Sequence, residues 1–337
     1  MVQPIRSKLD LSGCLESRQG GRSENQDFAG VAETPLGTLI VVCDGMGGMR
    51  GGSTASRLAV TTILEYFQKA DPQENAAMLL VKAIQSANTA VWEAGSANPE
   101  LHGMGTTVTA LLLNEICATA AHVGDSRIYQ LRRGKKVYRS FDHSMVFEMV
   151  RKKVITEEQA RLSAQSNIIM KALGIKPEVE VNTHRLCYKK GDRFVLCSDG
   201  FWGVMPEEEF IDLISVHNSL GKILESSCNT VEAIARKKGS EYDNLTAALI
   251  EMNCDSKLQP EMNTTAKIII AILAVLLAIS VTFNVLAKVK DSASSSSVYN
   301  GIMDSVRTDD KSTVIYLSGG LEKTLSDSTA IEISEKR

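Results

Sequence analysis

The segment LIVVCDGMGG, residues 39–48, decides the fold class. It opens with five apolar residues, three of them β-branched, and such a run favours a buried β-strand. Asp44 and Gly45 follow, and this dipeptide is typical of the turn that ends a strand. The segment therefore predicts a core strand with a carboxylate at its carboxyl end.

Segments of the same strand character recur along the chain, bounded by turn residues. The predicted strands are 39–45, 106–114, 116–124, 126–134, 193–200 and 245–253. The three consecutive ones, from 106 to 134, suggest an antiparallel meander. Helical patterns cover 53–67, with Ser53 as an N-cap candidate, and then 74–94, 156–164, 206–216 and 220–238. Strand runs interrupted by helices predict an α+β domain built in layers.

The composition is that of a globular protein with a large core. The chain has 337 residues, 44% of them hydrophobic and 23% charged, and a formal net charge of -3. This charge gives no sign of a surface for nucleic acid, so we expect no nucleic-acid partner. Seven cysteines form no CxxC pair, and several lie inside apolar strands, which favours a reducing, cytoplasmic environment.

A continuous apolar run, IIIAILAVLLAISVTFNVLA, occupies residues 268–287. About 20 residues at about 1.5 Å each span a bilayer core of about 30 Å, so the run predicts one transmembrane helix. The alternative, a buried helix of the soluble part, is weaker because globular helices are seldom apolar all round. Residues 1–255 then form the main domain and residues 256–267 the juxtamembrane linker.

Membrane orientation is not decided by the lysines that flank the run, because they are nearly balanced. The first 13 residues contain no apolar stretch of signal-peptide length, so we expect a cytoplasmic main domain, a single pass through the cell membrane and an external tail. The tail, 288–337, is rich in Ser, which predicts a linker or a disordered segment. Within it, STVIYLSGG has the character of a strand and a turn.

Acidic residues recur at the ends of the predicted strands. These residues are Asp27, Asp44, Asp125, Asp199 and Asp243. Each alone is more typical of a turn than of a metal ligand. If the sheets bring the strand ends together, however, several carboxylates converge, and like charges repel strongly without a cation. An oxygen-only cluster, in a chain without HExxH, suits Mg²⁺ or Mn²⁺ better than zinc.

An ordered series of motifs from residue 14 to about 252 resembles the type 2C metal-dependent protein phosphatases, the PPM family. The motifs are GRSENQD, VCDGMGG, GMGTT, HVGDSRIYQL, FDHS, VLCSDGFWG and DNLTAALI. The resemblance implies a central antiparallel β-sandwich flanked by α-helical pairs. It also implies hydrolysis of phosphoserine and phosphothreonine in proteins by a hydroxide that bridges two Mn²⁺ or Mg²⁺ ions.

The resemblance assigns a role to each residue of the predicted site. Asp44 would bridge the two ions, and the Gly45 carbonyl would be a further ligand. Asp199 and Asp243 would complete the coordination of this pair of ions, and Asp27 would act through water. Asp125 would share a third, weaker ion with Asp199, and Arg22 would bind the substrate phosphate. A guanidinium fork suits a phosphate dianion better than an ammonium group does. Catalysis would therefore rest on Asp44, Asp199, Asp243 and Arg22.

Some positions depart from the best-known form of the family. Met46 replaces a histidine that is a proposed general acid in eukaryotic members, and this methionine is familiar in bacterial ones. Gln26 stands where glutamate is common. His143 is interpreted as a structural hydrogen-bonding residue, Trp202 as a core residue, and Asn244 and Ser198 as residues that orient neighbouring ligands.

Other functions stay open at this point. The same fold could serve as a membrane-anchored pseudophosphatase that binds phosphoproteins, as a signalling component whose external tail senses a ligand, or as a hydrolase of small phosphoesters. The expected partners are phosphorylated proteins, with a Ser/Thr kinase and its substrates as the hypothesis by analogy.

Overall fold

The computed structural model describes residues 1–47, 51–163, 165, 168–258, 272–273, 275–282, 303–309, 312–317, 321–326 and 331–335. The chain divides into two compact units, Met1–Pro260 and Glu261–Arg337.

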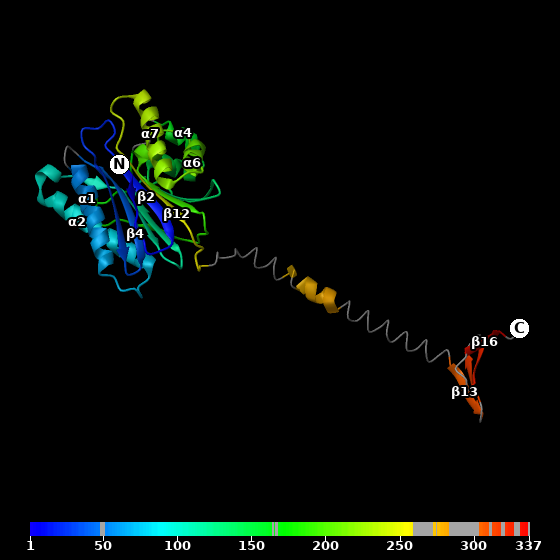
Figure 1. Ribbon diagram of the computed structural model, residues 1–337. Helices are drawn as coiled ribbons and strands as arrows, with labels where there is room; N and C mark the ends of the chain where they lie inside the picture. The colour runs from blue at the N-terminus through cyan, green and yellow to red at the C-terminus, as the bar shows by residue number, and fades with distance from the viewer. Residues whose placement is uncertain are drawn as a thin grey trace. The chain divides into compact units, whose positions relative to one another are not determined.

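Two antiparallel sheets form the centre of the larger unit (Figure 1). The first sheet has the order β1 (Gln3–Pro4), β2 (Leu11–Arg18), β12 (Leu245–Met252), β11 (Arg193–Cys197), β8 (Arg127–Arg132) and β9 (Lys135–Arg139). The second has the order β10 (Asn182–Leu186), β7 (Ala118–Val123), β6 (Val108–Leu113), β4 (Gly37–Met46) and β3 (Asp27–Thr34), with β5 (Gly105–Thr106) paired to β4.

Alternating side chains of these strands build a three-layered core. In β4, Ile40 and Val42 pack between the sheets with Phe194 of β11, while Val41 faces the helices on the other side of its own sheet. Because successive strand residues point to opposite faces, a strand covered on both sides must be apolar throughout. The long apolar run at 39–43 is explained in this way.

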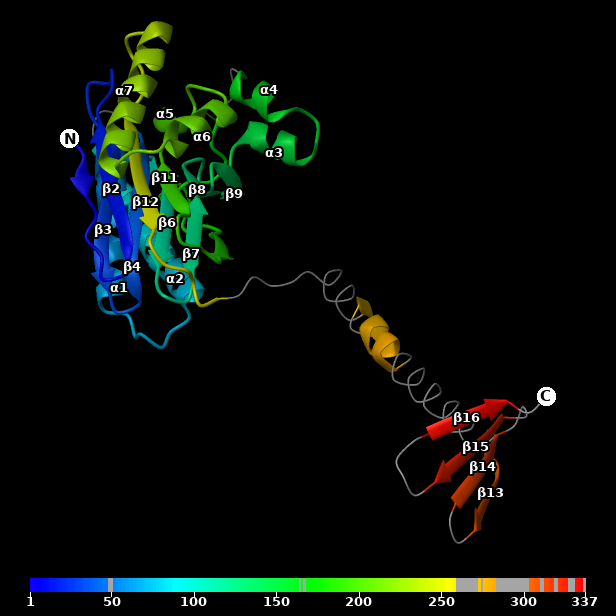
Figure 2. The same ribbon diagram turned by 45° about the vertical axis from the view of Figure 1, so that its right-hand side comes forward.

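Helices cover the outer face of each sheet (Figure 2). The helices are α1 (Gly51–Gln68), α2 (Ala76–Ala97), η1 (Pro99–Leu101), α3 (Met145–Arg151), α4 (Glu157–Arg161), α5 (Asp199–Trp202), α6 (Glu207–Ser215) and α7 (Leu220–Lys238). α1 and α2 pack on the second sheet, and α5, α6 and α7 pack on the first. The predicted sandwich with flanking helices is confirmed.

Two local predictions were wrong. α1 begins at Gly51 rather than after Ser53, and the Ser53 hydroxyl donates to Glu24 Oε1 at 2.7 Å instead of capping the helix. The predicted three-stranded meander holds only for β6 and β7. After Gly124, whose φ is +102°, the chain enters the other sheet as β8, between β11 and β9.

The smaller unit contains an antiparallel sheet in the order β13 (Met303–Asp309), β14 (Ser312–Leu317), β15 (Leu321–Ser326) and β16 (Ile331–Glu335). The predicted strand in STVIYLSGG is β14. The tail was otherwise expected to be a linker or disordered. The sequence IEISE alternates apolar and polar residues over its first four positions, a period of two that the serine-rich composition obscured, whereas LEKTLS has three consecutive polar residues and no such alternation.

Much of the predicted membrane span, 268–287, lies outside the described residues, and so does the linker beyond Leu258. Residues 272–273 and 275–282 are helical. Over the part of the chain that the structure describes, no helix has both the length and the apolar character needed to cross a bilayer.

Candidate active site

Strand ends from both sheets meet at one end of the sandwich and carry the predicted aspartates there. Asp27 opens β3 and Asp44 lies near the end of β4, and the two are register partners. Asp199 follows β11, and Asp243 comes just before β12, which pairs with β11. Asp125 lies in the turn between β7 and β8. The topology therefore brings together carboxylates that are up to 216 residues apart in the sequence, Asp27 and Asp243 being the extremes.

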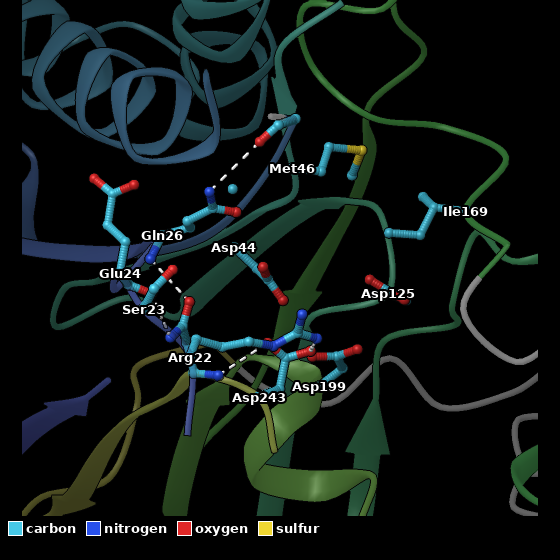
Figure 3. Close-up of a pocket in the computed structure, with 13 residues that line it drawn as sticks. Arg22, Ser23, Glu24, Gln26, Asp44, Met46, Asp125, Ile169, Asp199 and Asp243 are labelled. Carbon is cyan, nitrogen blue, oxygen red and sulfur yellow. Dashed lines mark hydrogen bonds and ion pairs between the residues drawn. The ribbon is translucent and has the colours of Figure 1, made fainter. Parts of the chain in front are cut away.

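A cavity of about 380 Å³ opens among these strand ends (Figure 3). Its lining includes six of the seven residues predicted for the site, namely Arg22, Asp44, Gly45, Asp125, Asp199 and Asp243. Figure 3 shows the carboxylates of Asp44, Asp125, Asp199 and Asp243 turned toward a common space. The seventh residue, Asp27, is 3% exposed and lies beneath them. The cavity also has lining residues that the sequence did not single out, Ser23, Glu24, Gly47 and Ile169.

Asp44 is held through its backbone by two threonines of the GMGTT motif. The Asp44 N–H donates to Thr107 Oγ1 at 3.0 Å, and the Asp44 carbonyl accepts from Thr107 N at 2.8 Å and from Thr106 Oγ1 at 2.9 Å. Thr107 Oγ1 also lies 2.7 Å from Ser126 Oγ, beside Asp125. Thr107 thus joins the Asp44 strand to the Asp125 turn, a role that the sequence did not reveal because paired threonines are ordinary in strands.

Gly45 must be glycine because another backbone crosses at this point. A Cβ on Gly45 would lie 2.1 Å from the Gly52 carbonyl oxygen and 2.7 Å from that of Gln26. This close approach explains the DG pair better than a simple turn does. The Gly45 N–H also donates to the Gln26 carbonyl at 3.2 Å, which fixes the loop that carries Arg22 against the β4 strand.

Ser198 and Asn244 orient their neighbours, as predicted. The Ser198 hydroxyl donates to Asp27 Oδ2 at 2.7 Å and accepts from Thr246 N at 3.0 Å. The Asn244 amide donates to the carbonyls of Gln19 and Glu24 at 2.6 and 3.0 Å. Asn244 therefore ties the 19–26 loop to the start of β12.

His143 lies behind the Asp125 turn and acts as a structural residue. Its Nδ1 accepts a hydrogen bond from Gly124 N at 3.2 Å, and its ring stacks on His122 at 4.7 Å. Burial, and next the neighbouring His122, lower the pKa of His143 to about 4. The imidazole is therefore neutral near pH 7 and serves as a hydrogen-bond acceptor for the backbone of the turn.

Trp202 contacts the same turn from α5, the helix that begins with Asp199. Its indole N–H donates to the Asp125 carbonyl at 3.2 Å, and the Arg127 guanidinium lies 3.2 Å from the centroid of its ring. Trp202 packs against two apolar clusters, as predicted for a core residue, and it also connects the two segments that carry Asp125 and Asp199.

Arg22 forms an ion pair with one of the cavity carboxylates. Its Nη2 lies 3.0 Å from Asp243 Oδ2, and the two side chains are 52% and 44% exposed. An exposed pair of this kind contributes about 1 kcal/mol or less to stability. Arg22 can therefore exchange Asp243 for another anion at little cost.

Burial and mutual repulsion make the aspartates poor acids. Burial, together with the charge of neighbouring carboxylates that include Asp243, raises the pKa of Asp27 to about 7 and that of Asp199 to about 6. Burial also raises the pKa values of Asp44 and Asp125 well above the usual range, with nearby carboxylates as the next cause. Strongly shifted carboxylates clustered in a cavity are typical of a functional site.

The donor set fits a hard divalent cation. Asp27 Oδ1, Asp125 Oδ1 and Asp199 Oδ1 are buried oxygens without a hydrogen-bond partner within the described residues, and such oxygens are rare unless an ion or water satisfies them. Among those residues, no three Asp, Glu, His or Cys side chains already surround one ion position. The oxygen-only chemistry nevertheless suits Mg²⁺ or Mn²⁺, which neutralise the repulsion that raises these pKa values.

Comparisons with known proteins agree with this site. The family described as protein phosphatase 2C matches residues 16–227. The chain is 33% identical over 240 residues to the serine/threonine phosphatase stp of Listeria welshimeri, covering 70% of this chain and 93% of that protein.

Solved structures of serine/threonine phosphatases share the fold. The serine/threonine phosphatase of S. agalactiae superposes with a TM-score of 0.63 at 31% identity, over 72% of this chain and 99% of that one. The catalytic domain of the phosphatase PstP, in complex with two manganese ions, gives a TM-score of 0.59 at 27% identity, over 72% and 97% of the two chains.

The matched region contains the strand ends that carry Asp27, Asp44, Asp125 and Asp199, while Asp243 lies just beyond the match. The two sheets and the cavity among the strand ends are compatible with the phosphatase activity of the proteins that the chain matches. The chain therefore belongs to the protein phosphatase 2C family and is a protein serine/threonine phosphatase that depends on Mn²⁺ or Mg²⁺.

Proposed function

We propose that the cavity bounded by Asp44, Asp125, Asp199 and Asp243 is the place where phosphoserine and phosphothreonine of protein substrates are hydrolysed. The observation that carries the proposal is the convergence of these four carboxylates around one opening that Arg22 also lines. A pseudophosphatase with the same fold is disfavoured, because every aspartate predicted for the site is present and lies in or beneath the cavity.

Each side chain has a separate task in this proposal. Asp44, Asp199 and Asp243, with the Gly45 carbonyl, would hold two divalent cations, and Asp125 with Asp199 a third. Such cations lower the pKa of a water molecule and neutralise charge on the phosphoryl oxygens. Asp27, the register partner of Asp44, accepts a hydrogen bond from the Ser198 hydroxyl and in this way supports the residues that contact the ions.

Arg22 orients the substrate by leaving Asp243 and presenting its planar fork to the phosphate. Met46 lines the cavity but carries no transferable proton, and the described lining residues include no histidine. The leaving serine or threonine oxygen therefore takes its proton from water in the cavity.

The test uses the full-length chain and a phosphothreonine peptide, with Mn²⁺ or with EDTA. Asp44→Asn and Asp199→Asn should each lower phosphate release by more than about 100-fold. Asp212→Asn, at an exposed position of α6, is the matched control and should behave as wild type. Folded protein that binds Mn²⁺ without turnover would instead support the pseudophosphatase.

We further propose that residues 268–287 anchor the enzyme in the cell membrane, with the catalytic unit in the cytoplasm and the tail outside. Two observations support this. The helical residues 272–273 and 275–282 include large apolar side chains that are more than half exposed, such as Leu273 and Leu277. All seven cysteines are free thiols, which suits a reducing compartment.

Cell fractionation and protease protection test the anchor. The chain should sediment with membranes, and a tag after Arg337 should be cleaved by protease added to intact cells, while a tag before Met1 is protected. The opposite pattern would reverse the orientation. A Ser/Thr kinase and its substrates are the proposed partners, and a pull-down that enriches neither would contradict that assignment.

A further inference from the structure

Large apolar side chains are exposed in one short part of the catalytic unit beside the cavity. Six of them lie within 26 residues, and we call these the apolar rim: Met145, Met149, Val154, Leu162, Ile168 and Met170. Val154 and Leu162 are both 68% exposed and Met170 is 55% exposed. An exposed group of apolar side chains on a soluble surface is typical of a binding site.

Backbone contacts bring members of the apolar rim together. Met145 and Met149 are one turn apart on α3 and share a face of that helix. The Met145 N–H donates to the Ile168 carbonyl at 3.1 Å, and the Val154 N–H donates to the Met149 carbonyl at 2.9 Å. At least four rim residues are therefore neighbours.

The apolar rim is continuous with the catalytic cavity. Ile169 pairs with Ser144 in a short antiparallel bridge and lines the cavity, where its side chain faces Asp125 in Figure 3. In an extended segment, neighbouring side chains point to opposite sides. Ile168 and Met170, on either side of Ile169, therefore point away from the side that faces the cavity, and they are 44% and 55% exposed.

Folding of this segment does not need the exposed side chains. Val146, Phe147 and Ala160 already form a buried apolar cluster beneath α3 and α4. A capping box of Thr156 and Gln159 fixes the start of α4. Neighbouring charges are paired within the helices, as in Glu148 with Arg151 and Glu158 with Arg161. The exposed apolar side chains of the rim are therefore available to bind another molecule.

We propose that the apolar rim binds apolar side chains that flank the phosphorylated residue of a protein substrate. The proposal rests on the function assigned above and makes it more specific, because it predicts a preference for phosphoserine or phosphothreonine next to bulky apolar residues. The occupant is the substrate rather than a second copy of this chain. Ile169 lines the cavity and lies between two rim residues, so a chain whose phosphoryl group enters the cavity lies close to the rim, whereas a second copy there would obstruct the mouth.

The test combines two peptides, two variants and one small substrate, using the full-length chain with Mn²⁺. The peptides carry phosphothreonine between two leucines or between two serines, and the small substrate is para-nitrophenyl phosphate. Wild type should hydrolyse the leucine peptide with a kcat/KM roughly five- to tenfold above that for the serine peptide. Met170→Gln should remove most of this preference, and Met78→Gln, at a 61% exposed position of α2, should retain it.

Para-nitrophenyl phosphate separates this proposal from the general activity. Its turnover by Met170→Gln should stay within about twofold of wild type, since it has no flanking residues. Equal kcat/KM for the two peptides in wild type, with para-nitrophenyl phosphate still hydrolysed, would overturn the apolar rim but not the phosphatase. A dimer in light scattering that Met170→Gln dissociates would also overturn it, in favour of self-association.

If wild type hydrolyses none of the three substrates, the proposed function fails instead. Peptide binding measured by fluorescence anisotropy then still tests whether the apolar rim binds apolar side chains. Tighter binding of the leucine peptide that Met170→Gln abolishes would support the apolar rim, and equal binding of both peptides would refute it.

Discussion

Burial, and next the repulsion between neighbouring carboxylates, disfavours the charged form of the aspartates at the cavity, and this cost should appear in the stability of the enzyme. The folded pKa of Asp27 is about 7, whereas an unfolded aspartate titrates near about 3.9. Folded protein therefore keeps a proton that unfolded protein loses between about pH 4 and pH 7. Asp27 thus lowers the free energy of unfolding as the pH rises through this window.

We expect Asp27→Asn to reveal this effect in EDTA. The replacement amide cannot ionise, so the variant should match wild type near pH 4 and become more stable than wild type by on the order of 2–4 kcal/mol above pH 7. Urea denaturation at several pH values measures the difference, and comparison of the two proteins cancels the titration of the buried histidines. With saturating Mn²⁺ the advantage should disappear. An Asp27→Asn protein that is less stable than wild type at every pH would contradict the argument.

Arg22 offers a second prediction at the residue scale. Arg22→Lys keeps the charge but loses the fork that holds two phosphate oxygens. KM for a phosphothreonine peptide should rise roughly tenfold while kcat changes little, because the interaction lost is already present in the bound substrate. Arg6→Lys, at an exposed position outside the cavity lining, is the control. A fall in kcat with unchanged KM would place Arg22 in the transition state instead.

Single residues were the most predictable level of this site. Asp44 and Asp199 stand out because each ends a continuous apolar run. Thr107 does not stand out, since its importance comes from two hydrogen bonds to Asp44 that only the pairing of distant segments creates. Ile169 was missed for the same reason, because an isoleucine near a helix gives no sign that it faces a cavity.

At the scale of elements, one buried ion pair joins the parts that surround the Asp125 turn. Arg127 of β8 and Asp142 are 3% and 1% exposed, and two hydrogen bonds of 2.9 and 2.7 Å connect them. The same guanidinium stacks on Trp202 of α5 and contacts Phe147 of α3. The Arg127 guanidinium of β8 therefore holds α3 and α5 against the Asp125 turn.

Removing that cation should destabilise the enzyme strongly. Arg127→Met leaves Asp142 buried without its partner, and we expect a loss of about 3–5 kcal/mol in the free energy of unfolding. The double variant Arg127→Met with Asp142→Leu should recover a large part of the lost free energy of unfolding, because both charges of this buried pair are then removed. Chemical denaturation of the three proteins measures both effects. A double variant no more stable than Arg127→Met would show that specific hydrogen bonds matter more than charge burial.

Elements were predicted well where they are long and poorly where they are short. α7, with 19 residues, was found from its apolar spacing alone. α5 has only four residues, too few for a helical period to appear, so no helix was predicted between β11 and α6. The strand β8 was predicted, but its place in the first sheet was not. The chain passes from one sheet to the other at the turn containing Gly124, and the strand-like sequence pattern is the same before and after that turn.

At the scale of the whole molecule, the catalytic cavity and the end of the catalytic unit lie at opposite ends of the sandwich. β12 starts beside Asp243 and ends at Met252, and eight residues of strand at about 3.3 Å each cover about 26 Å. Beyond β12, Leu258 N donates to the Ile116 carbonyl at 2.7 Å, next to the turn that joins β6 and β7 at the end remote from Asp44. The chain therefore leaves the catalytic unit far from its active site.

This arrangement predicts that anchoring should not hinder catalysis. If residues 268–287 lie in a membrane, we expect the distance between Leu258, the last described residue of the catalytic unit, and the cavity to leave the cavity mouth accessible to protein substrates. Full-length enzyme reconstituted in liposomes, with the catalytic unit outside, should match the kcat/KM of detergent-solubilised enzyme on the phosphothreonine peptide within about twofold. Deletion of 268–287 should release the protein from liposomes without changing that value. Activity that appears only after detergent is added, in liposomes whose catalytic units are shown to face outward, would mean that the bilayer covers the cavity and that the linker folds back along the sandwich.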